Sequence, residues 1–133
     1  MPFGTATVVT NSGKAVAAKR QVGATPAQAE PKYIAIGVGA TGAARTAAAA
    51  DTALSTEVET RATGTPSTVT TTNTNDTYQT VGTITASASR AVDEAGTFDQ
   101  SSVGGNMDVS ATFAVVNLAN GDSIQLTFKK QFT

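Results

Sequence analysis

The stretch PSTVTTTNTNDTYQTVGTIT, residues 66–85, decides the fold. Threonine is β-branched and stiff at χ1, which suits it to a pleated sheet, and its hydroxyl can face water on the outer side. The polar segment 73–76 divides the stretch and holds Asn and Asp, which favour turns. We therefore expect strands near 66–72 and 77–88 to form a hairpin with a solvent-exposed outer face.

The alternation of apolar residues predicts further strands after this hairpin. One face of a strand over 107–116 would carry Met107, Val109, Ala111, Phe113 and Val115. The pair Asn120-Gly121 is a strong hairpin signal, and it precedes a second alternating run over 123–132. On the apolar face of that run lie Ile124, Leu126, Phe128 and also Lys130.

A further strand is predicted over 32–38, before the hairpin. Ile34, Ile36 and Val38 share one face and should be core, and we also expect Tyr33 to be buried. The small residues of 41–50 indicate a loop or a weak helix. Residues 51–58 fit one helical turn capped by an aspartate.

The first thirty residues differ from the rest. Residues 5–10 indicate a short strand, 14–22 fit either a short helix or a second strand, and 24–31 are a linker between prolines. The cations Lys14, Lys19 and Arg20 lie here, in a solvated segment or in an arm that docks on an acidic partner. We expect an N-terminal arm or small extension over 1–30 and a β-sandwich domain over 31–133.

Several short strands separated by turn signals predict the fold class. The chain should be all-β and mainly antiparallel, with a β-sandwich that is jelly-roll-like or immunoglobulin-like. It should contain at most one or two short helices.

The composition argues against several classes of function. The 133 residues include no His, Cys or Trp, which removes the commonest general base and all thiolate chemistry. The net charge is −1 and 14% of residues are charged, with no basic patch that would suit a nucleic acid. No apolar run reaches the roughly 20 residues that span a bilayer. The start of the chain lacks the features of a signal peptide, so we expect synthesis in the cytoplasm.

One motif matches a nucleotide-binding fingerprint. Residues 37–42, GVGATG, fit G-x-G-x-x-G after an apolar strand. The fingerprint needs alternating strands and amphipathic helices, whereas 43–50 has no large apolar face and everything after residue 60 has a β pattern. We therefore interpret the motif as a glycine-rich loop and expect no cofactor.

Carboxylates are the only candidate catalytic groups. Asp93 and Glu94 are neighbours, so a strand would point them to opposite faces, and nothing pairs them with Asp99 or Asp108 across a cleft as a glycan hydrolase requires. Asn73, Asn75 and Asp76 offer oxygens to Ca²⁺ but lack the spaced ligands of a dedicated loop, so a plain solvated turn is favoured. We expect no catalytic residue, no metal site and no small-molecule substrate.

A set of phrases through residues 31–133 resembles small β-rich structural proteins of tailed bacteriophages. They are PKYIAIGVG (31–39), DTAL (51–54), TIT (83–85), EAGTFD (94–99), GGNM (104–107) and FAVVNLANGDSIQLTF (113–128). Within EAGTFD, we expect a turn at Gly96 that sends Phe98 into the core. Phages use such sequences in capsid decoration (cement) proteins and in tail or fibre-associated proteins.

This resemblance implies a structural protein and not an enzyme. It suggests that the chain binds the major capsid protein on the outside of the virion, as a homo-oligomer and commonly a trimer. The alternative is an adaptor associated with the tail or tail fibre. The candidate capsid contacts are Phe3, Lys14, Lys19 and Arg20. Neither nucleic acid nor membrane is expected as a partner.

Overall fold

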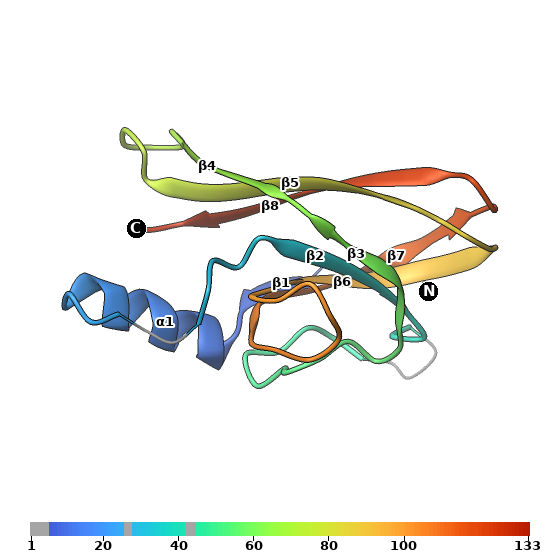
Figure 1. Cartoon of the computed structure of the whole chain (residues 1–133), viewed down its shortest axis with the longest axis horizontal. Coiled ribbons are helices and arrows are strands. Elements are labelled where there is room, and N and C mark those ends of the chain that lie inside the picture. Colours follow the sequence, from blue (N-terminus) through green and yellow to red (C-terminus); the bar gives the residue numbers. More distant parts are fainter. Residues whose placement is uncertain (1–5, 26–27, 42–44) are drawn as a thin grey trace.

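The computed structural model describes residues 6–25, 28–41 and 45–133, which form a two-layer β-sandwich with one short helix (Figure 1). The elements are β1 (Ala6–Val9), α1 (Asn11–Gln21), β2 (Tyr33–Val38), β3 (Glu57–Thr63), β4 (Thr65–Val69), β5 (Thr77–Thr85), β6 (Arg90–Phe98), β7 (Met107–Leu118) and β8 (Ser123–Gln131). One sheet has the order β1-β7-β6-β2-β3 and the other β4-β5-β8, and all pairs are antiparallel. The predicted all-β class is confirmed.

The core lies between the two sheets. Ile34 and Ile36 are fully buried there, as predicted from the alternation in β2, while Val38 and Tyr33 are only half-buried. The opposite face of the five-stranded sheet carries a second apolar cluster that includes Ala35, which residues 45–56 help to cover. Strand β2 is therefore buried on both faces.

The hairpin predicted from the threonine-rich stretch is formed by β4 and β5. Most of its threonines are exposed, but Thr80 is buried on the same face as the core residue Ile84, and Thr77 is buried on the other face, where its hydroxyl bonds with Thr71 and Asp76 of the turn. Strand β4 is an edge strand, which explains how it tolerates Pro66, a residue without a backbone N–H.

An unbroken run of chain joins the two sheets along one side. Strand β3 ends at Thr63 and β4 begins at Thr65, so only Gly64 separates a strand of the larger sheet from a strand of the smaller one. The Gly64 N–H donates to the Lys32 carbonyl oxygen at 2.7 Å, and a Cβ at position 64 would lie 2.8 Å from that oxygen. Glycine is needed here because of close approach.

Three local expectations about turns and helices were wrong. The chain over 51–56 is irregular and not helical, and Leu54 is buried without a helix. Gly96 lies inside β6, paired with Ser110 and Ala35, so no turn forms there, although Phe98 is buried as expected. Asn120-Gly121 makes a turn, but β7 and β8 lie in different sheets and form no hairpin.

Strand β7 also departs from the predicted pattern. Its first half is buried on both faces, from Met107 to Thr112, whereas Val115 is 45% exposed. A bulge causes the change, because Val92 pairs with Val116 but Glu94 pairs with Thr112, which leaves an unequal number of residues between the pairs. Such a bulge alters the twist and direction of the strand beyond it.

The N-terminal segment contributes directly to the sandwich. Strand β1 pairs with β7 from Ala6↔Thr112 to Val9↔Val109, and α1 follows at one end of the molecule (Figure 1). The helical alternative for this segment is therefore the one observed. Phe3 lies outside the described residues.

Candidate functional site

Helix α1 is fixed against β7 by its first turn. The Thr10 side chain caps the helix by accepting a hydrogen bond from the Gly13 N–H at 3.1 Å, and its hydroxyl donates to the Met107 carbonyl oxygen. The Thr10 N–H donates to the Asp108 carbonyl oxygen at 2.8 Å. A Cβ at Gly13 would lie 2.6 Å from that same oxygen, so only glycine allows this approach.

A bulge in β7 directs Asp108 away from the sheet. Thr97 pairs with Val109 and Phe98 pairs with Met107, which leaves Asp108 without a cross-strand partner. The Thr97 hydroxyl accepts from the Val109 N–H at 3.2 Å where the ladder is interrupted. Bulges re-aim side chains in this way, and the carboxylate of Asp108 meets Lys130 of the other sheet.

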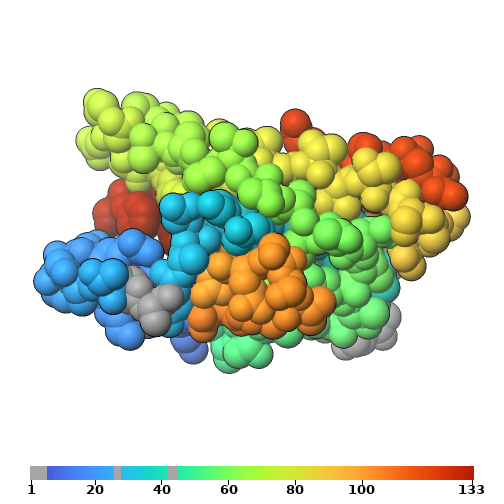
Figure 2. Space-filling model, viewed as in Figure 1, coloured from blue at the N-terminus to red at the C-terminus, as the bar shows by residue number. Residues whose placement is uncertain are grey.

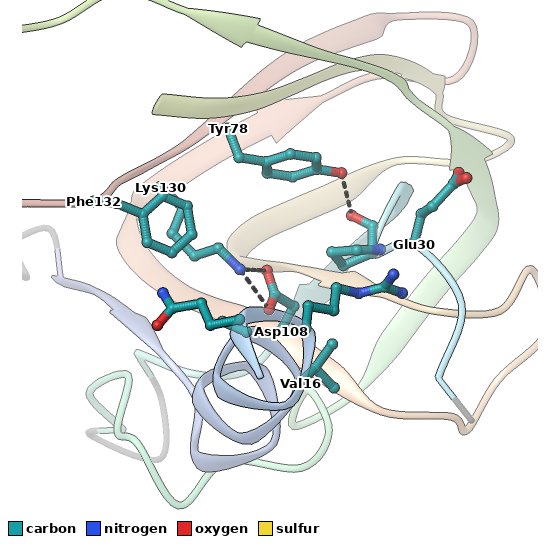
Figure 3. Close-up of a pocket in the computed structure, with 10 residues that line it drawn as sticks. Val16, Glu30, Tyr78, Asp108, Lys130 and Phe132 are labelled. Carbon is teal, nitrogen blue, oxygen red and sulfur yellow. Dashed lines mark hydrogen bonds and ion pairs between the residues drawn. The ribbon is translucent and has the colours of Figure 1, made fainter. Parts of the chain in front are cut away.

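The space between α1 and the end of the smaller sheet is a groove of ≈ 460 Å³, the helix groove. Its lining is Val16, Ala17, Arg20, Gln21, Glu30, Pro31, Tyr78, Asp108, Lys130 and Phe132 (Figure 3). The space-filling view shows α1 beside the C-terminal residues at this end of the molecule (Figure 2).

A largely buried ion pair forms part of the wall of the helix groove. The Lys130 Nζ lies 2.9 Å and 3.0 Å from the two Asp108 carboxylate oxygens, and the side chains are only 11% and 7% exposed. The rings of Tyr78 and Phe132 each have their centroid 5.7 Å from the same Nζ (Figure 3). This cation–aromatic geometry adds to the attraction that holds the ammonium in place.

Tyr78 closes the groove on the side of the linker. Its hydroxyl donates to the Pro31 carbonyl oxygen at 3.2 Å, which ties β5 to the chain before β2 (Figure 3). Burial raises the pKa of Tyr78 to about 12, and the negative charge of Asp108 adds to the effect. Tyr78 is therefore a neutral hydrogen-bond donor at ordinary pH. The groove can accept an apolar side chain between walls whose ammonium and carboxylate are already paired.

The predicted contact residues Lys14, Lys19 and Arg20 are all exposed on α1. Within the described ranges none of them forms an ion pair, and α1 itself contains no acidic residue. Arg20 lines the helix groove and donates to the Gln28 carbonyl oxygen at 3.2 Å. Lys19 and Arg20 also lie in the last turn, where cations complement the helix dipole.

A second charged cluster lies on the outer face of the larger sheet. Arg45 donates to Glu94 at 2.6 Å and to Asp51 at 2.6 Å, and the Ser110 hydroxyl also donates to Asp51 at 2.6 Å. The Glu94 side chain is fully buried and accepts the Ser55 N–H at 2.6 Å. These bonds attach the segment 45–56 to β6 and β7.

Within this cluster, burial has the largest effect on the Glu94 carboxyl. It raises the pKa of Glu94 despite the opposing effects of Arg45 and of the backbone N–H groups that donate to it. Because every group is engaged with its neighbours, we interpret the cluster as structural. Sequence reasoning missed Arg45, since a lone arginine in an alanine-rich segment gives no pattern.

The glycine-rich motif begins at the end of β2, and Gly39 to Thr41 continue it as a loop. The N–H groups of Ala40 and Thr41, which a phosphate would need, donate to the Asp93 carboxylate at 3.1 Å and 2.8 Å. Gly37 lies within β2, where a Cβ would be 2.5 Å from a Glu94 carboxylate oxygen. Part of the motif, at Gly42, is outside the described residues.

The polar turn between β4 and β5 is organised by one carboxylate. Asp76 accepts the N–H groups of Thr71, Thr72 and Asn73, each at 2.9 Å. These bonds hold the pKa of Asp76 well below its usual range. The carboxylate is satisfied by its own turn, which fits the interpretation of a plain solvated turn.

Comparisons of the chain with protein-family models, curated proteins and solved structures each found no significant match. No helix in the described part of the chain is long and apolar enough to cross a membrane.

Proposed function

We propose that the chain is a structural virion protein that binds the assembled capsid of a tailed phage and stabilises it. The phrases spread through residues 31–133 support the virion assignment by their resemblance to phage structural modules. The observation that carries the capsid-binding role is the exposed cationic set of α1, Lys14, Lys19 and Arg20, which lies beside the helix groove and forms no ion pair among the described residues.

The proposed mechanism is mass action. A protein that binds the assembled shell and not its free subunits shifts the shell toward the intact state by its binding free energy. Several copies in a homo-oligomer, for example a trimer, would add avidity without further chemistry. An acidic surface of the major capsid protein would complement α1, and an apolar side chain beside it would fill the helix groove.

The test compares two variants of equal net charge on purified shells that lack the protein. Lys14→Gln with Lys19→Gln removes two cations from α1, whereas Thr68→Glu with Thr83→Glu makes the same charge change on the exposed face of the β4–β5 hairpin. We expect the α1 variant to bind shells several-fold more weakly and the hairpin variant to bind like the wild type. Equal weakening would assign the effect to net charge and refute the role of α1.

The copy number in purified particles tests the location. A number comparable with that of the capsid subunits supports the shell. A small fixed number would favour the tail or tail-fibre adaptor and overturn the proposal.

A further inference from the structure

The side of the sandwich opposite Gly64 is open. Strands β3 and β4 are joined at one side, and the remaining edges are β1 in the larger sheet and β8 in the smaller one. The smaller sheet has three strands against five, so it does not cover the larger sheet completely. Within the described part of the chain, β8 pairs only with β5.

A groove of ≈ 360 Å³ follows this open side, between β8 and the β1–β7 margin, and we name it the edge groove. Its walls include Thr7, Ala95, Ala111, Phe113, Leu126 and Phe128. Ala95 is fully buried and Phe128 is 8% exposed, and both belong to the core. The edge groove therefore extends into the hydrophobic interior.

Strand β8 has the features of a strand that can accept another. It pairs with β5 over nine consecutive residues without a register shift, and it contains no proline. Edge strands of this length present unpaired N–H and C=O groups, and proteins usually protect them with bulges, prolines or charges. Lys129 is the exposed charge of β8 that borders the edge groove.

We propose that the edge groove binds an extended segment of another polypeptide, which adds to β8 as a fourth strand of the smaller sheet. Main-chain hydrogen bonds to β8 would supply the affinity, and side chains at alternate positions would enter the groove. Those side chains should be apolar, because Leu126, Phe128 and Phe113 form the walls.

Two observations define the occupant. Lys129 is exposed and forms no ion pair among the described residues, so a carboxylate on the added strand would complement it. Thr7 of β1 lines the same groove as β8, so the larger sheet reaches under the place of the added strand. If a second folded copy paired its own β8 with this β8, its larger sheet would collide with the part of the larger sheet that extends beyond β8. A single extended segment has no second layer and avoids this collision.

The test uses a synthetic seven-residue peptide of alternating valine and threonine with one aspartate, added to the full chain. We expect binding with a Kd of about 1 mM or tighter. Amide hydrogen exchange should become slower within β8 but not in the edge strands β3 and β4, which lie on the joined side of the sandwich. The same peptide with lysine in place of aspartate should bind about three- to tenfold more weakly. Lys129→Glu should reverse this preference.

Three results would overturn the proposal. The first is a peptide that leaves amide exchange in β8 unchanged, and the second is a charge preference that Lys129→Glu does not reverse. The third is evidence that the edge groove is already occupied. This would be seen either as a dimer in which β8 is protected or as faster amide hydrogen exchange in β8 after removal of residues 1–5. Because no shells are used, the outcome is independent of capsid binding.

Discussion

Replacing Lys130 with methionine should destabilise the fold more than an ordinary surface substitution. At 2.9 Å the Coulomb attraction of the Lys130–Asp108 pair is about 6 kcal/mol at an effective dielectric constant of about 20, before the desolvation of both ions is subtracted. Lys130→Met leaves the Asp108 carboxylate, 7% exposed, without its partner. Removing one partner of a buried pair costs about 3–5 kcal/mol, and the open groove beside this pair places the expected loss near 3 kcal/mol.

The double variant separates pairing from packing. Asp108→Asn with Lys130→Met removes both charges, so it should be less destabilised than the sum of the single variants by about 1–3 kcal/mol. Urea unfolding followed by circular dichroism gives the four free energies of unfolding. If the single-variant losses simply add, the two residues are not coupled and the structural role given to the pair is wrong.

Three further predictions follow from other contacts. Gly13→Ala should lower the free energy of unfolding by about 1–2 kcal/mol, because the clash of the new Cβ with Asp108 outweighs the gain in helix propensity. The control is Ala18→Gly at an exposed position of the same helix, which should lower it by only about 1 kcal/mol. The raised pKa of Glu94 means that the folded state binds this proton more tightly than the unfolded state does. The free energy of unfolding of the wild type, relative to that of Glu94→Gln, should therefore fall as the pH rises from below the ordinary glutamate range through the raised pKa. A difference between the two proteins that does not change with pH would contradict this. The pH dependence due to Asp76 has the opposite sign, because its pKa is lowered in the folded state. The ionised carboxylate stabilises the fold above the ordinary aspartate range, so wild-type stability relative to Asp76→Asn should decrease as the pH falls below that range. Thermal unfolding at several pH values measures this difference.

The sequence predicted the strands better than their partners. Alternation and turn chemistry are local, so the β4–β5 hairpin and the inward face of β2 could be recognised directly. The Asn120-Gly121 turn was also recognised, but its sequence cannot say that the next strand pairs with β5 and not with β7. Pairings such as β1 with β7 join residues about a hundred positions apart and depend on the whole fold.

The candidate site was only partly visible for the same reason. The exposed cations of α1 could be named from composition, and Lys130 could be placed on the apolar face of its strand, but no partner for it was predicted. That partner, Asp108, reaches Lys130 through a bulge, and a bulge depends on the register of two strands. The lining of the helix groove comes from five separate segments, so no single stretch of sequence contains it.

The run of chain through Gly64 gives the sandwich a direction-dependent mechanical strength. On that side a covalent backbone connects the two sheets. The edge strands β1 and β8 lie on the opposite side, near the two ends of the chain, and the backbone crosses between the sheets again only in the short segments that follow β5 and β7 within the described residues. The Lys130–Asp108 pair lies at the ends of β7 and β8 farthest from their connection, so a force that separates the layers there would act on this side-chain contact. A pull at the joined side would have to deform the backbone itself.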